Sequence, residues 1–175
     1  MKITSIETFD LRCAIEPSFG WSQGWVDQRM TTLVKISTDD GLVGWGEGAA
    51  APLINGLLAP LLISQDPMQR AGLWERMFHA LYNANNFVGL AGSALSALDI
   101  ALWDIAGKAT GLPIHALLGG KVRDQVAVYA TGLYYTEGEF PNRLLDEARS
   151  YVEQGFTGMK TKVGGLSIEE DVRRV

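Results

Sequence analysis

The stretch ALSALDIALWDIAGKATGLPIHALLG, residues 94–119, decides the fold of this chain. Its apolar residues recur at spacings of three and four, which predicts a helix with a strongly apolar face. The other faces are nearly as apolar, so we expect the helix to be buried between layers. Gly111 favours the left-handed backbone that ends a helix, and Pro113 prevents continuation. A short second helical piece should follow Pro113.

Two aspartates argue against a membrane-spanning alternative for residues 87–106. An Asp at the centre of a bilayer costs about 2.5–3.5 kcal/mol, and this segment contains both Asp99 and Asp104. Asp104 also precedes Lys108 by four residues, a spacing that pairs opposite charges on a helix in water. We therefore expect a buried helix of a soluble protein and no membrane partner.

The same stretch resembles the first signature of the mandelate racemase / muconate lactonizing branch of the enolase superfamily. The resemblance extends over the whole chain in the order of its elements. It implies an N-terminal α+β capping domain, followed by a modified TIM-type (β/α) barrel. The residues that carry the resemblance keep the spacing of the signature: Ala94, Ser96, Ala97, Leu98, Asp99, Ala101, Leu102, Asp104, Gly107, Lys108, Pro113, Ile114, Leu117, Leu118 and Gly119.

Composition and charge narrow the class of protein. The 175 residues are 47% hydrophobic and 20% charged, which is ordinary for a globular protein. A formal net charge of −5 without a basic cluster argues against a nucleic-acid partner. Cys13 is the only cysteine, so no intrachain disulfide can form. Because Met1 does not open a signal-peptide pattern, we expect a cytoplasmic protein.

Three segments near the start of the chain predict a three-stranded antiparallel sheet. Residues 2–12 and 29–37 alternate between apolar and polar side chains, as half-buried strands do. A turn signal at 39–41 joins the second strand to a returning strand at 42–47. These strands are expected to form the sheet of the capping domain.

Residues 13–28 contain proline and glycine, so we predict a loop that carries Phe19, Trp21 and Trp25. Two interpretations stay open. The loop could pack on its own domain, or it could be a flap whose rigid aromatic side chains bind substrate and exclude water. The family resemblance favours the flap, because the family uses a mobile loop at this place to set substrate specificity.

The glycines at 44, 46 and 48 do not form a phosphate-binding loop, because the lysine and the following helix of that motif are missing. They do not form a dinucleotide-binding loop either, because the glycine spacing is wrong and no βαβ unit follows. Glu47 lies between two of them, and a structural role at a strand end is favoured over a catalytic one. Residues 49–62 are apolar but contain Pro52, Gly56 and Pro60. The start of this segment is expected to form a second loop over the pocket.

A helix is predicted from Asp66, as N-cap before a proline, to about Tyr82, with a polar turn at 83–86. The chain's histidines, His79 and His115, both lie in helical contexts. Neither has a carboxylate or cysteine at the spacing of a metal site, so structural roles are favoured for both.

The charged segment 121–125 is the predicted domain boundary. It divides the chain into the capping domain, residues 1–123, and the start of the barrel, residues 124–175. A complete (β/α)₈ barrel takes about 250 residues. The barrel should therefore be incomplete here, and we expect this chain to be the first part of a longer protein.

After the boundary the pattern changes to strand, helix, strand, helix. Strands are predicted at 126–131 and 157–163, with a helix at 139–154 between them. Ser167-Ile168-Glu169-Glu170 is a capping box that begins another helix. Short connections between such elements imply a parallel sheet with right-handed crossovers, the first two β/α units of a barrel.

Lys160 and Lys162 are the predicted catalytic residues. They are two apart in the strand expected at 157–163, so their ammonium groups should share a face. Two like charges in a partly dry site favour release of one proton, which makes an amine a usable base. Active sites of these barrels lie at the C-terminal ends of the strands. The alternative is two surface lysines on an exposed strand.

The family resemblance implies a role for each lysine. Lys162 corresponds to the general base or acid that moves the proton α to a carboxylate. Lys160 corresponds to the group that helps neutralise the substrate carboxylate. The family also uses Mg²⁺, whose three carboxylate ligands lie on later strands, as does the opposing His–Asp base. No metal ligand is therefore expected in this chain, and the Mg²⁺ ligands should lie beyond Val175.

The resemblance implies that the complete protein abstracts the proton α to the carboxylate of a small molecule. We favour a sugar-acid (aldonate or aldarate) dehydratase, with a racemase or a lactone-forming cycloisomerase as alternatives. In a different class, the chain would be a non-catalytic fragment or assembly module that binds a partner chain. The resemblance also implies a homo-oligomer. The 175-residue chain alone is expected to be inactive.

Overall fold

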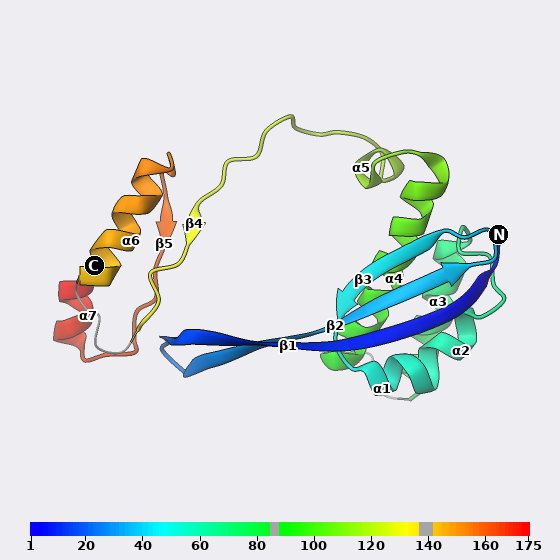
Figure 1. Cartoon of the computed structure of the whole chain (residues 1–175), viewed down its shortest axis with the longest axis horizontal. Coiled ribbons are helices and arrows are strands. Elements are labelled where there is room, and N and C mark those ends of the chain that lie inside the picture. The colour runs from blue at the N-terminus through cyan, green and yellow to red at the C-terminus, as the bar shows by residue number, and fades with distance from the viewer. Residues whose placement is uncertain (85–87, 137–141) are drawn as a thin grey trace. The chain divides into compact units, whose positions relative to one another are not determined.

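A computed structural model describes residues 1–84, 88–136 and 142–175 (Figure 1). Its elements in chain order are β1 (Ile3–Trp21), β2 (Gly24–Thr38), β3 (Val43–Gly48), α1 (Ala51–Leu53), the π-helical turn η1 (Ile54–Leu58), α2 (Ala59–Leu62), α3 (Arg70–Asn83), α4 (Leu90–Thr110), α5 (Ile114–Leu117), β4 (Ala130–Thr131), α6 (Asn142–Glu153), β5 (Met159–Lys160) and α7 (Ile168–Arg174).

The chain forms two compact units. Unit 1 consists of residues 1–12 and 30–122, and unit 2 consists of residues 13–29 and 123–175. The long first hairpin is therefore shared: the base of β1 and β2 belongs to unit 1, and their tip belongs to unit 2. The functional division of the chain at residue 123 remains a prediction.

The three-stranded sheet is confirmed, in the order β1-β2-β3. Strand β2 pairs antiparallel with β3, from Thr32 opposite Gly48 to Ser37 opposite Val43. Alternate side chains of β2 between Thr32 and Thr38 are buried, which gives the sheet one core-facing side. The predicted turn closes with a hydrogen bond from the Thr38 backbone N–H to the carbonyl of Leu42 at 3.0 Å.

The prediction of a loop at 13–28 is wrong. The two strands continue through this segment and leave only Ser22 and Gln23 as a turn. At Gly20 the strand exchanges two backbone hydrogen bonds with Tyr135, of 2.8 and 3.0 Å, within unit 2. These two bonds pair backbone groups that would otherwise hydrogen-bond to water, so the extended conformation is stable despite the proline and glycines.

The segment 49–62, predicted to begin as a loop, is helical from Ala51 as α1, η1 and α2. Its prolines lie at the first or second position of α1 and of α2, where a missing N–H leaves no hydrogen bond unmade. The expected helix start at Asp66 is also wrong, because α3 begins at Arg70 with Gln69 before it. Asp66 instead accepts a hydrogen bond from the backbone N–H of Met68 at 2.9 Å.

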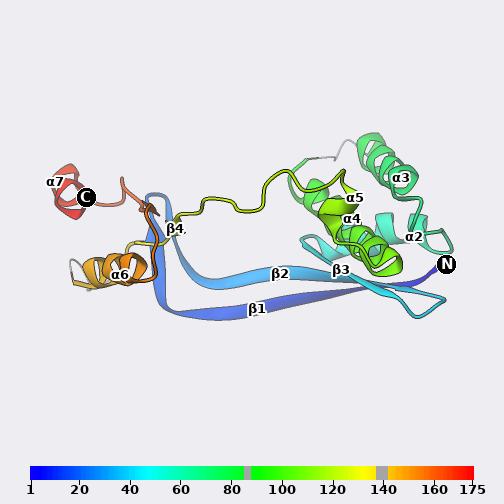
Figure 2. The ribbon, with the colours of Figure 1, turned by 90° about the horizontal axis from the view of Figure 1, so that it is seen from above.

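Helix α4 is the core helix of unit 1. Its predicted end is confirmed, because Gly111 adopts the left-handed conformation with φ of 66° and α5 follows Pro113. In length and composition α4 could cross a membrane, but half of its most apolar window is buried within the protein. Figure 2 shows α3 and α4 on the same side of the sheet. We therefore interpret its apolar surface as the lining of a protein core.

Glycines bring α4 unusually close to β3. A Cβ atom added at Gly44 or Gly46 would overlap the backbone carbonyl of Ala101 or Ala97. At Gly48 it would lie 2.5 Å from the carbonyl oxygen of Ser93. The alternating glycines of β3 therefore have a packing role, because every second residue of the strand faces the backbone of α4.

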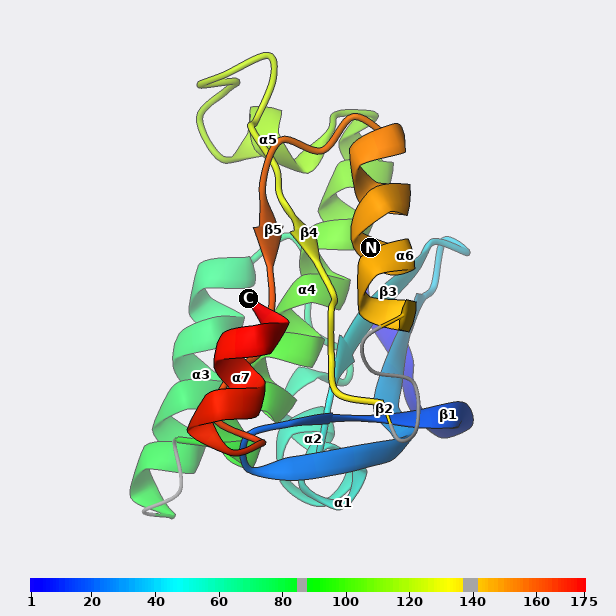
Figure 3. The same ribbon diagram turned by 90° about the vertical axis from the view of Figure 1, so that its left-hand side faces the viewer.

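Unit 2 contains the predicted parallel pair. Ala130 and Thr131 of β4 pair with Met159 and Lys160 of β5, and Figure 3 shows the two strands side by side. Both strands are shorter than the expected 126–131 and 157–163. Helix α6 lies between them in sequence, and residues 139–141 of its predicted range lie outside the described residues.

The predicted capping box at the start of α7 is confirmed. The Ser167 hydroxyl accepts from the backbone N–H of Glu170 at 3.3 Å, and the Glu170 carboxylate accepts from the backbone N–H of Ser167 at 3.1 Å. These two bonds satisfy donors that the first turn of a helix leaves free. Strand, helix, strand and helix thus follow in the predicted order.

Candidate functional site

Strand β5 ends at Lys160, so the two predicted catalytic lysines are not both in the strand. Lys160 pairs with Thr131 of β4 and its side chain is exposed. Lys162 lies two residues further along the chain and is partly buried. That the two ammonium groups share a face therefore stays a prediction, whereas their location at the C-terminal end of β5 is part of the structure.

Tyr134 connects Lys162 to the first hairpin. The Lys162 Nζ lies 5.5 Å from the centroid of the Tyr134 ring, on its face. The ring of Phe19 packs against the same tyrosine, with 4.6 Å between the ring centroids. A lysine ammonium at this distance from an aromatic face is attracted by the negative potential of the ring. The structure thus brings together one predicted catalytic residue and one predicted substrate-binding residue.

The hairpin aromatics differ in their surroundings. Arg29 lies on β2, the strand that returns from the hairpin tip, and its guanidinium carbon is 5.2 Å from the centroid of the Phe19 ring. The indole of Trp25 covers Gly20, where an added Cβ would lie 2.9 Å from the ring. Trp21 and Trp25 remain 38% and 51% exposed. Phe19 is therefore the aromatic side chain that contacts the strand-end residues.

A cavity of about 400 Å³ lies beside this aromatic contact. The hairpin supplies one wall and the chain after β4, with α6, supplies the other. Its size suits a small molecule of the kind that clefts in enzymes enclose. The lining residues are Ile15, Glu16, Pro17, Phe19, Tyr134, Thr136, Arg143 and Glu147.

A second tyrosine anchors the chain that follows Lys162. The Tyr135 hydroxyl donates to the Asp171 carboxylate at 2.7 Å and accepts from the backbone N–H of Gly165 at 3.0 Å. Burial, together with this bond to Asp171, raises the pKa of Tyr135. The Tyr135 hydroxyl in turn lowers the pKa of the Asp171 carboxyl. The pair joins the chain after β4 to α7.

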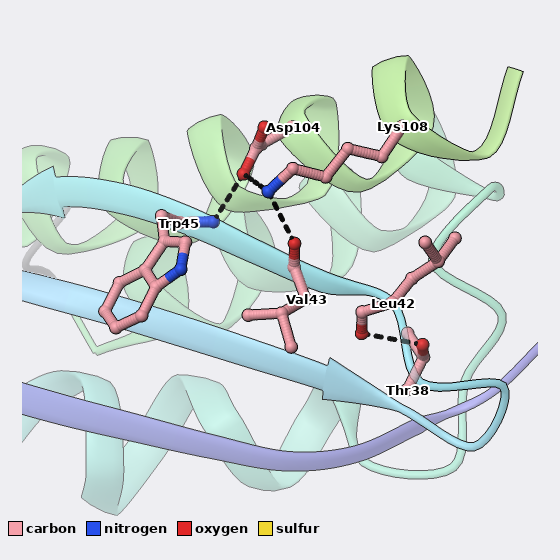
Figure 4. A network of polar contacts seen from close by, with 6 residues as sticks. All are labelled: Thr38, Leu42, Val43, Trp45, Asp104 and Lys108. Carbon is pink, nitrogen blue, oxygen red and sulfur yellow. Dashed lines mark hydrogen bonds and ion pairs between the residues drawn. The ribbon is translucent and has the colours of Figure 1, made fainter. Parts of the chain in front are cut away.

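The signature aspartate Asp104 has a structural role in unit 1. Its carboxylate accepts from the backbone N–H of Trp45 and from Lys108, and the Lys108 ammonium also donates to the carbonyl of Val43 at 2.7 Å (Figure 4). Strand β3 is an edge of the sheet. Asp104 and Lys108 thus satisfy a donor and an acceptor that the edge leaves unpaired.

The other polar candidates also have structural partners. Glu47 accepts from the hydroxyl of Thr31 at 2.7 Å across the β2–β3 pair. His79 lies 3.4 Å from the carboxylate of Glu75 on the surface of α3. Within residues 1–84, 88–136 and 142–175, no group of three His, Cys, Asp or Glu side chains could hold a metal ion. The described residues therefore do not by themselves fit an Mg²⁺ site.

A larger cavity, of about 540 Å³, opens in unit 1 beside α3 and α4. The Arg70 guanidinium lies 3.3 Å from the centroid of the Trp103 ring, and its Nε and Nη1 atoms are buried without a hydrogen-bond partner among the described residues. Burial raises the pKa of the neighbouring Asp99 carboxyl, against the opposing effect of Arg70. All five predicted site residues belong to unit 2, so this cavity is not part of the candidate site.

The sheet with its helical layer, followed by parallel strand–helix units, defines the N-terminal capping domain and barrel start of the enolase superfamily. A solved member of that superfamily from Polaromonas sp. JS666 superposes with a TM-score of 0.85 at 31% identity, over 99% of this chain and 47% of that one. The family model for the N-terminal domain of mandelate racemase / muconate lactonizing enzyme matches residues 3–119. This chain belongs to the mandelate racemase / muconate lactonizing enzyme family.

Curated relatives share the sequence at similar levels. The D-galactarolactone cycloisomerase of Agrobacterium fabrum is 39% identical over 99% of this chain and 47% of its own length. The arabinonate dehydratase of Saccharolobus solfataricus is 40% identical over 81% of this chain and 39% of its own length. The chain thus spans about half the length, or less, of the curated relatives that it matches.

Tyr134 is the site residue that the sequence interpretation missed. It follows the predicted strand 126–131, and aromatic residues at the C-terminal end of a barrel strand are placed to line an active site. Its position after a predicted strand was the sequence signal that could have identified Tyr134. The contact of Tyr134 with Phe19 carried no signal, because it depends on the pairing of the hairpin with the chain after β4.

Proposed function

We propose that the complete protein abstracts the proton α to the carboxylate of a small sugar acid and eliminates water from it. Lys162 removes the α-proton, and the hydroxyl on the neighbouring carbon leaves as water after protonation. The enol that remains converts to a 2-oxo acid. The observation that carries this proposal is the location of Lys162 at the end of β5, against Tyr134 and beside the hairpin.

Lys160 is the proposed partner for the substrate carboxylate. Its side chain is exposed at the end of β5, where a negatively charged group from solution can reach it. Phe19 forms the aromatic wall of the neighbouring cavity, and we propose that Trp21 and Trp25 cover substrate from the hairpin tip. Exposed indoles are suited to this role because they gain buried area when a ligand arrives.

Mg²⁺ is the proposed cofactor, with ligands from residues beyond Val175. The support for it is family membership alone, since the described residues present no ligand set. The protein is further proposed to be cytoplasmic and homo-oligomeric. A small carboxylate substrate agrees with the names of the cycloisomerase and dehydratase relatives.

A lactone-forming cycloisomerase is the second candidate reaction. The cycloisomerase of Agrobacterium fabrum favours it, because that relative aligns with 99% of this chain. Both reactions, and racemisation, begin with removal of the same proton. They differ in the next step: a dehydratase expels a hydroxyl group from the neighbouring carbon, a cycloisomerase breaks or forms a lactone bond, and a racemase returns a proton to the opposite face of the α-carbon.

Proton exchange tests the shared first step. The complete protein would be incubated with Mg²⁺ and a panel of aldonates, aldarates and their lactones in D₂O, and ¹H NMR would follow loss of the α-proton signal. Lys162→Ala should abolish exchange, and Lys160→Ala should mainly raise KM. Lys35→Ala, which removes only a surface ion pair with Glu7, is the control and should match the natural protein.

The products separate the candidates. A 2-oxo acid lighter than the substrate by one water supports the dehydratase, a ring-opened or ring-closed product of unchanged mass supports the cycloisomerase, and deuterium incorporation with inversion supports a racemase. Absence of exchange with every substrate, in protein whose fold is verified by circular dichroism, would contradict the proposed function. Retention of full exchange in Lys162→Ala would contradict the assignment of the base.

A further inference from the structure

Arg174, in the last turn of α7, is the charged side chain that the described residues bury most completely. It is 7% exposed, and the other buried polar side chains among those residues are the threonines Thr32 and Thr38. Burying a guanidinium is costly unless its donors are satisfied. The groups that accept hydrogen bonds from the guanidinium therefore indicate the structural role of this buried side chain.

The acceptors of Arg174 are backbone carbonyls at the ends of both parallel strands. Its Nη2 donates to the carbonyl of Leu133 and, at 2.9 Å, to that of Tyr134, both of which follow β4. Its Nη1 lies 3.5 Å from the carbonyl oxygen of Lys162, which follows β5. A guanidinium presents several donors in a rigid plane, so one side chain can hold these backbones in a fixed relation.

The backbone at Leu133 needs such support. Its φ of 54° is in the left-handed region, which a branched apolar residue rarely adopts. The Leu133 carbonyl also accepts from the hydroxyl of Thr161 at 3.1 Å. Donors from α7 and from the chain after β5 thus converge on one strained residue, immediately before Tyr134. Strained backbone of this kind persists where the surroundings impose it, and it is concentrated at functional sites.

Contacts with Tyr135 and through Asp171 hold α7 in place. Its carbon lies 4.1 Å from the centroid of the Tyr135 ring, whose hydroxyl bonds Asp171 in the same helix. The Asp171 carboxylate also accepts from the backbone N–H of Gly164 at 2.5 Å. The segment that carries Lys162 is therefore fixed on both sides: by Arg174 at its own carbonyl and by Asp171 two residues later.

We propose that Arg174 is a positioning residue for Lys162. It fixes the backbones of Lys162 and Tyr134 relative to each other, and so fixes the approach of the ammonium to the tyrosine ring. Arg174 itself touches neither substrate nor the reacting proton. The inference rests on the proposed function for its kinetic consequence, but the positioning of the ammonium can be measured without any turnover.

The first test is chemical labelling of the lysines in the complete protein. Limited reductive methylation followed by peptide mass spectrometry gives the rate of labelling at Lys162 and, as an internal reference, at Lys160. Arg174→Met removes all the carbonyl contacts while keeping a long side chain. It should raise the labelling of Lys162 relative to Lys160, because the ammonium leaves the aromatic face. Arg173→Met, which breaks only the exposed pair with Glu169, should leave the ratio unchanged.

The second test is kinetic and uses the proton-exchange assay. Arg174→Met should lower kcat by roughly 10- to 100-fold while KM changes little, because displacing a reacting group by about 1 Å can cost about a hundredfold in rate. The limb of the pH–rate profile that reports the base should also move. Arg174→Lys keeps the charge but not the planar set of donors, so it should recover only part of the rate. If Arg174→Met does not fold, the rate of Arg174→Lys tests the positioning role instead.

The outcomes separate this inference from the proposed function. If the natural protein shows no exchange but the labelling ratio rises in the folded Arg174 variants, the function fails and the positioning stands. If exchange occurs but a folded Arg174 variant keeps the natural labelling ratio, kcat and pH profile, the positioning role is overturned. A fall in thermal stability alone, with kcat per folded molecule unchanged, would overturn it as well.

Discussion

The carboxylate of Asp104 accepts a hydrogen bond from the backbone N–H of Trp45 at 2.8 Å, across 59 residues of sequence. One helical turn later, Lys108 pairs with the same carboxylate at 2.7 Å and also reaches the Val43 carbonyl. Two residues of the family signature therefore act on the free edge of β3. Their spacing of four lets one helix face satisfy both a donor and an acceptor of that edge.

Asp104→Asn should destabilise unit 1. The amide keeps an acceptor but loses the charge that binds the Lys108 ammonium. We expect the free energy of unfolding to fall by about 1–2 kcal/mol, which lies between the ranges for exposed ion pairs and for hydrogen bonds to charged groups, because both side chains are partly exposed. Urea denaturation followed by tryptophan fluorescence measures the change.

Asp146→Asn is the matched control for that substitution. Asp146 forms an exposed pair with Arg149 on α6 at 3.2 Å. Exposed pairs of this kind contribute little, so the change should stay below about 0.5 kcal/mol. Equal effects of the two substitutions would show that Asp104 acts only as a surface charge and not as a partner of the strand edge.

Gly46→Ala should be among the most damaging single substitutions in unit 1. The added methyl group would enter the backbone of α4 at Ala97, which cannot move aside as a flexible side chain could. We expect a loss of about 3 kcal/mol or more, or failure to fold. Circular dichroism and the yield of soluble protein report either result.

Gly72→Ala provides the contrast for Gly46→Ala. Gly72 lies inside α3, and an added Cβ there meets nothing within 4 Å. Alanine should therefore stabilise the helix by about 0.5–1 kcal/mol, since it restricts the unfolded chain and favours helix. Tolerance of both substitutions would contradict the close contact between β3 and α4.

Tyr151 should make the stability of unit 2 depend on alkaline pH. Its hydroxyl donates to Glu147 at 2.7 Å, and this bond, with burial, raises the pKa of Tyr151 from 10.0 to about 12. The stabilisation is complete below pH 10, where folded and unfolded chains both hold the proton. It is lost as the pH rises through 12, where the folded phenol ionises too.

Spectrophotometric titration at about 295 nm, with thermal melts at each pH, tests the alkaline behaviour. Tyr151→Phe should remove one late-titrating phenol and flatten the loss of stability above pH 10. Tyr129→Phe, which removes an exposed phenol on the same unit, should leave the late step in place. A late step that survives in Tyr151→Phe and vanishes in Tyr129→Phe would refute the assignment.

On the acid side, Tyr135 should control the ionisation of Asp171. The Tyr135 hydroxyl is the main cause of the lowered pKa of Asp171, so Tyr135→Phe should raise that pKa towards the ordinary value of 3.8. A lowered folded pKa stabilises the fold above the pH at which the unfolded carboxyl titrates. The stabilisation is lost as the pH falls through the folded value. Carboxyl ¹³C NMR measures the pKa of Asp171 directly.

Ser167→Ala separates this effect from a general change in α7. The Ser167 hydroxyl is the main cause of the lowered pKa of the neighbouring Glu170. Its removal should raise the pKa of Glu170 and leave that of Asp171 nearly unchanged, with the reverse pattern in Tyr135→Phe. If both variants moved both carboxyls equally, disorder of the helix rather than the two hydrogen bonds would be the cause.

Features governed by neighbours in sequence were predictable. The end of α4 at Gly111, the short α5 and the capping box at Ser167 all depend on contacts within one helical turn. The alternation of β2 and β3 likewise follows from a sheet with one buried face. These signals are local in sequence, and tertiary contacts did not override them.

The wrong predictions concern residues whose polar groups found other hydrogen-bond partners than the local pattern suggests. Asp66 caps a turn of its own rather than α3, because its carboxylate accepts from Met68 while its carbonyl accepts from Gln69. The glycine- and proline-containing hairpin tip is extended because Gly20 pairs with Tyr135, far along the chain. No window of sequence around Gly20 contains that partner.

The candidate site shows the same limit. Lys162 was identified because its motif lies after a predicted barrel strand, but its aromatic neighbour Tyr134 and the buried Arg174 come from other elements. The left-handed backbone at Leu133 had no signal at all, since leucine rarely adopts it. Residues that support a site through tertiary contacts leave little trace in the local pattern.

The glycines of β3 also have a consequence for how this domain can diverge. The distance between the sheet and α4 is set by main-chain atoms, so substitutions of core side chains cannot widen or narrow it. A descendant sequence can replace the outward-facing Trp45 and Glu47 with the loss of surface contacts such as the Thr31–Glu47 hydrogen bond, yet it must keep the smallest residue at each alternate position. The pattern Gly-x-Gly-x-Gly therefore marks a fixed distance between strand and helix, and it would reveal this helix–strand register in sequences that share little else.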